Sequence, residues 1–381
     1  MERHAERILI VGAGPGGLAL ALALKQRGFQ PELIERQPTW DTEGAGIHMV
    51  ANGVRILREL GVGDQVERRG FPIRALKFLT NTGEEVIRLN LPELFPDAPP
   101  YLGIHRAELL YGLAEAIDDT PVRFKTTVTA TKNQRDGVVV SFSDGTRDRF
   151  DLLVAADGLH SQLRREVFSE LEPDYLGVAV WWFTAARPPQ LTESHFLIGP
   201  HHPVVIIPIS RNEAYCTVST RVHTIQPDAE EDRLERVQAL LEGFASPASD
   251  IAAQLHSPQQ LIPRSLYQVR METWHTSRVL LIGDAAHAMP PTLAQGTSMA
   301  LEDAAVLAEL LNDRRGVEET LLAFEARRRP RVHTVQEHSV NRLKVFFPKD
   351  SGDFAARLAM LRKSGREVIP APWRTLIENN P

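Results

Sequence analysis

The sequence predicts an α/β fold in which a Rossmann-like nucleotide-binding domain is interrupted by an antiparallel sheet and followed by C-terminal helices. A glycine-rich loop, GAGPGG, follows the apolar strand ILIV at residues 8–11. Much later, the apolar strand RVLL at 278–281 leads into Gly283-Asp284 and then a helix. Between these motifs lie short segments rich in β-branched and aromatic residues, which are typical of strands.

Length and composition narrow the function classes. With 381 residues, 43% of them hydrophobic, the chain can bury the core of two or three domains. Acids and bases are interspersed and sum to −6, so we expect neither a nucleic-acid nor a membrane partner. The single cysteine, Cys216, excludes an intramolecular disulfide, a dithiol redox pair and a Cys-built zinc site, and we expect no metal. Because no apolar run approaches about 20 residues and no cleavage site follows the glycine loop, we expect a cytoplasmic protein.

The glycine-rich loop has the spacing G-x-G-x-x-G between a strand and a helix. Gly12 permits the tight turn, Gly14 lets the backbone approach a pyrophosphate, and Gly17 lets helix and strand pack closely. The helix start supplies unpaired N–H groups to the anion. An ordinary glycine-rich turn is the alternative, but strand, helix, second strand and acid follow in the expected order. The loop residues that we expect to hold a dinucleotide are Gly12, Gly14, Pro15 and Gly17.

Glu35 lies near the end of the second predicted strand, PELIER at 31–36. It follows Gly12 by 23 residues, close to the spacing of about 20 expected of an acid that accepts from the adenosine ribose hydroxyls. Arg36, beside it, would favour a 2′-phosphate only if a nicotinamide nucleotide occupied this loop. The loop alone leaves the dinucleotide open, because flavin and nicotinamide cofactors share the adenosine diphosphate half.

Two later motifs decide which cofactor binds. The segment DLLVAADGLHSQLRREV, residues 151–167, is an apolar strand that ends in Asp157-Gly158 and leads into a helix with Ser161 and Arg164. The third motif is GDAAH, residues 283–287. The three motifs span most of residues 7–312, and in this order they resemble the single-component (class A) FAD-dependent aromatic hydroxylases, with the p-hydroxybenzoate hydroxylase fold. In motif style the chain is most similar to hydroxybenzoate and hydroxynicotinate hydroxylases.

The resemblance implies how FAD would be held. Asp284 would accept a hydrogen bond from a ribityl hydroxyl; a helix cap or strand-end turn is the alternative. The loop 290–298 would pass the pyrimidine edge of the flavin, and its N–H groups and the next helix's positive end would stabilise the anionic reduced ring. Many members have Gly-Gln-Gly here, whereas this chain carries a methyl at the first position. The loop residues expected at the flavin are Pro291, Ala294, Gln295, Gly296 and Thr297.

The resemblance also gives roles to Arg106 and Asp157. Arg106 matches a family position at a helix start that reaches the cofactor, although the residues alone favour a surface pair with Glu108 or Glu115. In the family, Asp157 helps hold the flavin and a transiently visiting nicotinamide nucleotide. The alternative for Asp157 is a turn aspartate before glycine.

The segments between the motifs predict an antiparallel sheet, with strands at 177–185, 195–199, 203–210 and 213–220 and an added hairpin at 76–97. The FAD-binding domain is then discontinuous, comprising residues 1–75, 98–175 and 273–347. The substrate-binding sheet domain comprises 76–97 and 176–272, and 348–381 form a C-terminal helix and tail. In this arrangement the substrate lies between the sheet and the flavin, at a domain interface.

His48 and Tyr215 are the expected catalytic residues. The resemblance places the segment 44–61, with His48, at the active face of the flavin. Tyr215 lies on a predicted strand and shares a face with Thr217 and Ser219. Facing the flavin, the two could relay the phenolic proton of the substrate, because a phenolate is the better nucleophile. The alternatives are a loop hydrogen bond for His48 and a packed ring for Tyr215.

The run ARRRPRVHTVQEH, residues 326–338, is the sharpest basic cluster. It could attract a nucleotide phosphate, but the pattern favours the solvated face of a long helix that Pro330 kinks. His287 and Met289 are further pocket candidates, of lower rank.

These observations predict an FAD-dependent monooxygenase that uses NADH or NADPH and O2 to hydroxylate a small aromatic or heteroaromatic substrate through a flavin C4a-hydroperoxide. A monooxygenase of larger polycyclic compounds such as tetracyclines, and a flavin-binding protein without turnover, are the alternatives left open. A flavin halogenase is disfavoured, since its Trp-x-Trp-x-Ile-Pro stretch is not matched by WWFTAA. The sequence does not choose between NADH and NADPH, or between a monomer and a homodimer.

Overall fold

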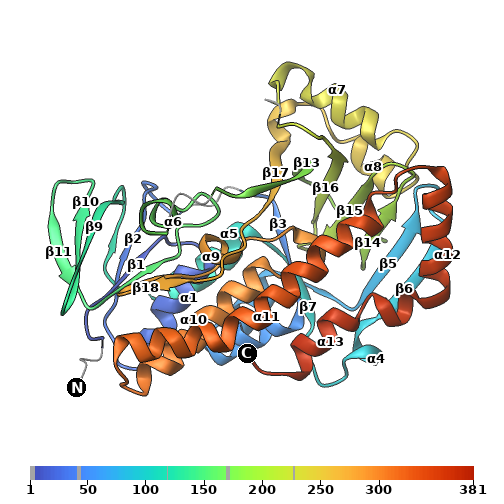
Figure 1. Ribbon diagram of the computed structural model, residues 1–381. Helices are drawn as coiled ribbons and strands as arrows, with labels where there is room; N and C mark the ends of the chain where they lie inside the picture. Colours follow the sequence, from blue (N-terminus) through green and yellow to red (C-terminus); the bar gives the residue numbers. More distant parts are fainter. Residues whose placement is uncertain (1–4, 41–43, 118, 169–171, 226–227) are drawn as a thin grey trace.

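The computed structural model describes residues 5–40, 44–117, 119–168, 172–225 and 228–381 (Figure 1). A six-stranded and a seven-stranded sheet form its two halves, joined by helices that include the long α10 and α11. Two three-stranded sheets complete the strand content. No helix in the described part of the chain is both long and apolar enough to span a bilayer.

The six-stranded sheet positions the three sequence motifs. Its order is β18 (His275–Thr276), β19 (Val279–Leu281), β12 (Leu152–Ala155), β1 (Ile8–Val11), β2 (Glu32–Ile34) and β8 (Val122–Arg123). Except for β18, neighbouring strands are parallel. The strands β1, β12 and β19 are buried throughout, as expected of a parallel sheet covered on both faces. Because these three are adjacent, their carboxyl ends bring the loops at Gly12, Asp157 and Gly283 to one edge.

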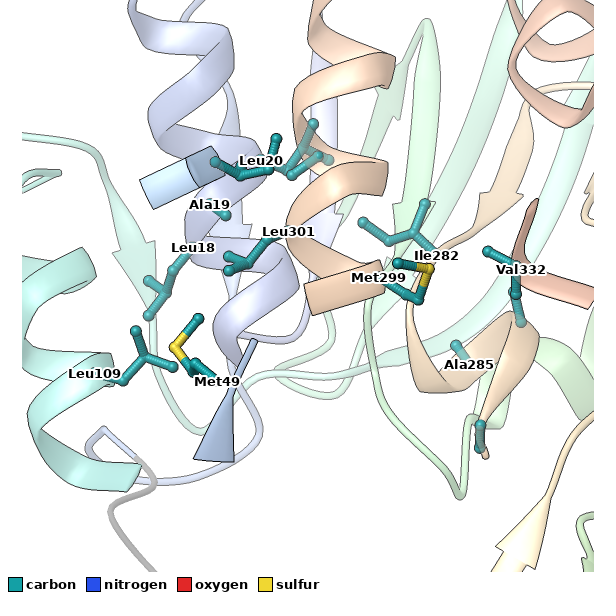
Figure 2. Close-up of a cluster of buried hydrophobic side chains, with 14 of the residues drawn as sticks. Leu18, Ala19, Leu20, Met49, Leu109, Ile282, Ala285, Met299, Leu301 and Val332 are labelled. Carbon is teal, nitrogen blue, oxygen red and sulfur yellow. The ribbon is translucent and has the colours of Figure 1, made fainter. Parts of the chain in front are cut away.

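Helices α1 (Pro15–Lys25) and α10 (Gly296–Asn312) pack beside that edge. Figure 2 shows buried side chains from both helices, including Leu20 and Leu301. A Cβ built on Gly16 or on Gly283 would lie 3.2 Å from the Cβ of Ala300 in α10. Helix α10 is therefore pressed against both loops, and its start is fixed relative to them.

The small sheets were not predicted. One has the order β11 (Arg147–Phe150), β10 (Gly137–Phe142), β9 (Val128–Gln134), and the other has β3 (Gly46–Met49), β7 (Tyr101–His105), β4 (Phe71–Ile73). The remaining helices of this half are α2 (Ala51–Glu59), α3 (Gly63–Arg69), α5 (Arg106–Glu115), α6 (Gln162–Val167) and α9 (Asp284–His287).

The seven-stranded sheet contains the predicted strands and the predicted hairpin. Its order is β17 (Ile262–Gln268), β13 (Asp174–Ala186), β16 (Glu213–Arg221), β15 (Pro203–Pro208), β14 (Ser194–Ile198), β5 (Ala75–Thr80) and β6 (Glu85–Asn90). The prediction of a wholly antiparallel sheet is wrong at one place, because β14 and β5 run parallel. We propose the division into an FAD-binding part and a sheet part at the predicted boundaries.

The two faces of this sheet pack against different partners. On the outer face, Trp181, Phe183 and Val218 form a core with α7 (Glu230–Leu241) and α8 (Ala248–Ala252). On the inner face, Phe78 and Ile207 join the main core of the molecule. Strand alternation thus sets Trp181 and Trp182 on opposite faces, as predicted, and the inner face is the one turned toward the cofactor half.

The C-terminal region is more helical than predicted. Helix α11 (Val317–Phe346) continues through Pro330, α12 (Ser351–Val368) packs on β6, and a further helix, α13 (Ala371–Glu378), packs on α2. Short helical pieces complete the fold: α4 (Leu91–Leu94), η1 (Pro258–Gln260) and η2 (Pro291–Leu293).

Candidate active site

The three glycines of the first loop have three different surroundings. Gly12 has a φ of +105°, and a Cβ there would lie 2.4 Å from the carbonyl oxygen of Ala156. A Cβ on Gly17 would lie 1.9 Å from the carbonyl oxygen of Gly12. Around Gly14, in contrast, no atom lies within 4 Å of that position. Gly12 and Gly17 are thus required by packing, while Gly14, just before Pro15 and the α1 N-terminus, leaves room for a phosphate group.

Glu35 ties the end of β2 to this loop. Its Oε2 accepts a hydrogen bond of 2.8 Å from the Ala13 N–H, and its Oε1 accepts one of 2.9 Å from the Gln37 N–H. A carboxylate has lone pairs for further donors, so a ribose hydroxyl can still bind. Arg36, the next residue, is exposed.

Asp157 caps α6 and keeps one oxygen unused. Its Oδ2 accepts from the N–H groups of Gln162 (2.9 Å) and Leu163 (3.3 Å), and Ser161 caps the same helix. Its Oδ1 is buried and has no hydrogen-bond partner among the described residues. Burial raises the pKa of this carboxyl. The turn interpretation therefore explains one oxygen, and the other is available to a ligand.

Arg164 joins the second motif to the third. Its guanidinium is 1% exposed and donates to the carbonyl oxygens of Ala285 (2.9 Å) and Leu159 (2.7 Å). Since Ala285 lies in α9, this arginine fixes the Asp157 loop relative to Asp284.

Asp284 begins α9 and stays accessible, although protein surrounds it on most sides. The Asp284 side chain is exposed. Burial of its surroundings nevertheless raises the pKa of its carboxyl, although the charges of His287, Arg106 and Arg164 lower that pKa in part. A Cβ built on Gly296 would lie 3.8 Å from Asp284 Oδ1, so the carboxylate faces the start of α10. Asp284 is therefore an accessible carboxyl group beside the start of α10.

Arg106 begins α5 on the side of Asp284. Gly44, with a φ of +126°, lets the chain pass the arginine, because a Cβ there would lie 2.8 Å from Arg106 Cδ. The side chain is half-buried, and its charge acts on Asp284. The prediction that Arg106 belongs to the cofactor site is therefore compatible with its position.

Hydrogen bonds to residues of α13 and α11 hold the loop before α10 in place. Trp373 of α13 donates its Nε1–H to the Leu293 carbonyl (3.0 Å), and the Thr292 hydroxyl donates to the Ser339 carbonyl (2.6 Å). Ala294 takes the left-handed conformation, with a φ of 54° and a ψ of 40°. The Ala294 methyl is accommodated at the cost of that strained conformation.

Gln295 is held in the loop by its side chain, and its place at the flavin stays a prediction that concerns its backbone. Its side chain is fully buried and exchanges two hydrogen bonds with Asn52, at 3.0 and 3.1 Å. Only its backbone can face a ligand. Pro291 is exposed, and Gly296 and Thr297 are half-buried at the start of α10, where the structure shows no side-chain cap from the residues it describes. The N–H groups at the start of α10 are therefore not used by a side-chain cap from the described residues.

Behind the loop lies a buried ionic network that the sequence pattern did not predict. Glu302, Asp303 and Arg328 have no exposed surface. Arg328 donates to Asp303 Oδ1 (2.9 Å) and Glu302 Oε2 (2.7 Å). Arg331 donates to both oxygens of Glu302, at 2.8 and 2.9 Å. The prediction that the basic run is a solvated helix face is wrong at Arg328, which is wholly enclosed between α10 and α11.

The network reaches both ends of the cofactor loop. His287 Nε2 lies 2.6 Å from Asp303 Oδ2, which also accepts from the Gly283 N–H at 3.0 Å. Asn52, which binds Gln295, donates to Glu302 at 2.8 Å. His287 is thus part of this support, and the interpretation of His287 as a pocket residue is wrong.

The charges within the network keep its acids ionised. Burial by itself would raise the pKa of Asp303, but His287 and Arg328 outweigh it and hold the pKa at about 2. Burial likewise opposes ionisation of Glu302, and the charges of Arg328 and Arg331 lower its pKa nevertheless. An acidic pair inside the apolar helix SMALEDAAVLAELL was the available sequence signal, since a buried acid requires a partner.

On the substrate side, β3 crosses the inner face of the large sheet at Tyr215. A Cβ on Gly46 would lie 2.5 Å from the Cβ of Tyr215, so only glycine allows this crossing. His48, two residues along β3, shares the face of Gly46. Its ring centroid lies 6.0 Å from that of Tyr101 and 6.5 Å from that of Phe196. The structure therefore brings His48 to the same sheet face as Tyr215.

Polar atoms at this place have no partners. His48 Nε2 and the Tyr101 hydroxyl are buried without a hydrogen bond to any described residue. Burial lowers the pKa of His48 to about 4, so its imidazole is neutral near pH 7. Burial also raises the pKa of Tyr215 well above its ordinary value, which keeps its hydroxyl protonated.

A separate cavity of about 680 Å³ opens on the outer face of the sheet. His160, Trp181, Arg236 and Tyr267 are among its lining residues, and it lies next to the loop after Asp157. Tyr215 and His48 lie on the other face of the sheet. The size of this cavity therefore does not make it the place of reaction, because it is not lined by the two residues expected to act on the substrate.

Known proteins share this arrangement over nearly the whole chain. Residues 6–339 match the FAD binding domain family. The chain is 31% identical to the putative FAD-dependent monooxygenase YetM of Bacillus subtilis, covering 88% of this chain and 92% of that protein. It is 32% identical to the 2-heptyl-3-hydroxy-4(1H)-quinolone synthase of Pseudomonas aeruginosa, covering 87% of each. The structure of Klebsiella pneumoniae HpxO complexed with FAD and uric acid superposes with a TM-score of 0.89 at 27% identity, covering 97% of this chain and 96% of that one.

Proposed function

Since the chain belongs to the FAD binding domain family and is an FAD-dependent monooxygenase acting on aromatic or heteroaromatic compounds, we propose that it hydroxylates a small, phenol-like ring with electrons from NADH or NADPH. The observation that carries this proposal is the meeting of three loops at one sheet edge. There Gly14 leaves open space, Asp157 keeps a buried oxygen unpartnered and Asp284 stays accessible. This donor and acceptor set fits the pyrophosphate and hydroxyl chain of FAD.

Each part of the cofactor has a residue to hold it. Gly14 and the α1 N-terminus would take the pyrophosphate, Glu35 the adenosine ribose, and Asp284 the ribityl chain. The N–H groups at Gly296 and Thr297, at the positive end of α10, would face the pyrimidine edge of the flavin and stabilise negative charge on it. When bound, the flavin takes electrons from the nicotinamide and activates O2 for transfer of one oxygen atom to the ring.

His48 and Tyr215 would orient the ring to be hydroxylated. Because His48 is neutral and its Nε2 lacks a partner, it can exchange a hydrogen bond with a hydroxyl or carbonyl group. A histidine with a pKa of about 4 is a weak base, so we assign it hydrogen bonding and not storage of the substrate's proton. Tyr215, kept protonated, would donate to the same substituent.

The relatives support a heteroaromatic ring. One is named for making a 3-hydroxyquinolone, and another was solved with uric acid bound. Both compounds carry a carbonyl or hydroxyl group on a nitrogen-containing ring system, which suits a neutral histidine and a tyrosine as hydrogen-bonding partners.

The proposal is tested first on the FAD-loaded protein. We expect oxidation of NADH or NADPH to be stimulated by one class among hydroxybenzoates, hydroxypyridines, quinolones and tetracyclines, with a product one oxygen atom heavier by mass spectrometry. His48→Gln and Tyr215→Phe should slow hydroxylation and retain FAD, while Tyr111→Phe, at an exposed tyrosine, should change neither. Unchanged turnover in both active-site variants would remove these residues from the mechanism, and absence of oxygenated product with every class would contradict the proposed function.

A further inference from the structure

Four side chains on the inner face of the large sheet form one line across it. In the strand registers, Phe196 of β14 pairs with Val205, Val205 pairs with Thr217, and Thr217 pairs with Trp182 of β13. All four are half-exposed. We call these four residues the accessible row.

On the two middle strands, β15 and β16, the exposure is confined to the accessible row, whereas Thr184 on β13 is half-exposed as well. On β15 and β16, the next residues of the same face, Ile207, Tyr215 and Ser219, are buried, as is Val180 on β13. Such half-exposure in the middle of a seven-stranded sheet is not an edge effect. Other elements cover the sheet more completely on both sides of Val205 and Thr217 than at the row, where Phe196, Val205 and Trp182 pack only in part against the main core.

The row passes both proposed ring-binding residues, His48 at Phe196 and Tyr215 at Thr217. His48 lies 6.5 Å, between ring centroids, from Phe196. Tyr215 is two residues from Thr217 on the same face of β16. From Phe196 the row crosses three strand spacings to Trp182, a span of about 14 Å. A single aromatic ring is little wider than one such spacing, so a one-ring substrate would cover only its first part.

The chemistry of the row is apolar and uncharged. Phe196, Val205 and Trp182 are hydrophobic, and Thr217 offers one hydroxyl. Of two nearby cations, Arg342 is engaged elsewhere, because it donates to the Ile369 carbonyl (2.7 Å) and its guanidinium lies on Trp373. The other, the exposed Arg264, lies over the Trp182 ring at the far end of the row. A carboxylate at Val205 or Thr217 would lose hydration beside apolar side chains, because Arg264 lies only at the Trp182 end.

We propose that the substrate is an uncharged aromatic or heteroaromatic ring that carries an extended apolar group. The ring lies at His48 and Tyr215, the apolar group lies along the accessible row toward Trp182, and Val205 and Thr217 determine how much of that group binds. This inference rests on the proposed function, which supplies the ring site.

A chain-length series tests it on the FAD-loaded full chain. The probes are 4-hydroxyquinolines with methyl, propyl, pentyl and heptyl groups at position 2, with 3-hydroxybenzoate and 4-hydroxybenzoate as short, charged rings. Calorimetry gives each Kd without turnover, and NAD(P)H oxidation with product mass gives turnover. We expect Kd to fall by up to about fourfold for each added methylene until the row is filled, and the benzoates to bind more weakly than the heptyl compound.

Thr217→Phe should block the middle of the row. It is expected to abolish the gain from pentyl and heptyl chains and to leave the methyl compound within about twofold of its original Kd. The matched control is Thr220→Phe, on the same strand but the opposite face, which should keep the whole gain. If Thr217→Phe does not fold, the wild-type series still decides.

Equal Kd values across the chain lengths, tighter binding of a benzoate than of the heptyl compound, or equal loss in both phenylalanine variants would overturn the inference. Oxygenation of a benzoate without any chain-length gain would overturn it and leave the proposed function intact. Absence of oxygenated product from every probe would instead count against the proposed function.

Discussion

The two sides of the candidate cofactor site differ in how their buried polar and charged groups are paired. Behind the loop at 291–296, charged groups are buried and paired: Arg328 with Glu302 and Asp303, and His287 with Asp303. In front of it, on the side of the large sheet, the buried polar atoms of His48 and Tyr101 have no partner among the described residues.

The difference teaches which side has its charges paired before a ligand arrives, although His287 Nδ1 in the rear network also has no partner among the described residues. A buried charge without a partner costs several kcal/mol, so a network with all its charges paired holds its helices in one arrangement. An unpartnered but uncharged group costs about 1–3 kcal/mol, which a ligand's hydrogen bond recovers. The rear therefore holds the loop at 291–296 in one arrangement, and the front keeps the unpaired hydrogen-bonding groups to which we assign the substrate.

Removing the central charge of the rear network should have the largest effect. Arg328→Met leaves Glu302 and Asp303 buried without their shared cation, which is expected to lower the free energy of unfolding by about 3–5 kcal/mol. Urea denaturation measures this loss. Arg329→Met, next in sequence but partly exposed, should change stability by less than about 0.5 kcal/mol. A loss in Arg328→Met as small as in this control would show that the network does not hold the platform.

The acid between the two sides comes next. Asp284→Asn keeps the side-chain shape but removes the charge that would accept a ribityl hydroxyl. A hydrogen bond to a charged group contributes about 1.5–3 kcal/mol, so the Kd for FAD should rise by roughly 10- to 100-fold. Fluorescence titration of the apoprotein with FAD measures it, with circular dichroism confirming the fold and Asp313→Asn at the end of α10 as control. Unchanged FAD affinity would remove Asp284 from the cofactor site.

The two sides should also respond to different pH ranges. Burial lowers the pKa of His48 to about 4, below the ordinary 6.5. The unfolded chain therefore binds the proton more readily, and stability falls as pH drops from about 6.5 to 4, by up to about 1.4 kcal/mol per pH unit. For Asp303, held at about 2, the loss begins only below about pH 4, as the pH approaches 2.

His48→Gln should reduce the loss of stability between about pH 6.5 and 4 and leave the loss below about pH 4 unchanged. His195, whose pKa burial also lowers to about 4, keeps part of the slope. Unfolding midpoints between pH 7 and 3 measure both ranges, and His201→Gln, at an exposed histidine, is the control. If stability above pH 4 depended on pH in the same way in His48→Gln as in the original chain, His48 would not be the group whose protonation destabilises the fold in this range.

The smallest expected effect concerns the loop between the two sides. Ala294 is left-handed, a conformation that costs a non-glycine residue about 1–2 kcal/mol. Replacing Ala294 with glycine would remove this cost, but the greater freedom of glycine in the unfolded chain offsets part of the gain. Ala294→Gly should therefore raise the free energy of unfolding by less than about 1 kcal/mol. The control is Ala323→Gly inside α11, which should destabilise by about 1 kcal/mol. Equal destabilisation in both variants would show that no strain is stored at Ala294.

Much of the cofactor half could be predicted because its requirements are local. Gly12 and Gly17 are needed where backbone atoms approach too closely for a Cβ, and such positions are written directly in the sequence. Asp157 and Asp284 follow apolar strands, so a parallel sheet must bring them to the same edge. Strand alternation likewise requires Trp181 and Trp182, as neighbours on one strand, to point to opposite faces of the sheet.

Only the tertiary structure decided what those local elements enclose. Arg328 is one of several arginines on a helix, and its burial depends on Glu302 and Asp303, which come from another helix, 26 and 25 residues earlier. The accessible row depends on which side chains other elements fail to cover, and the sequence of the strands contains no trace of that. Turn geometry and strand alternation depend on residues that are close together in the sequence, whereas charge pairing and exposure depend on segments that meet only after folding.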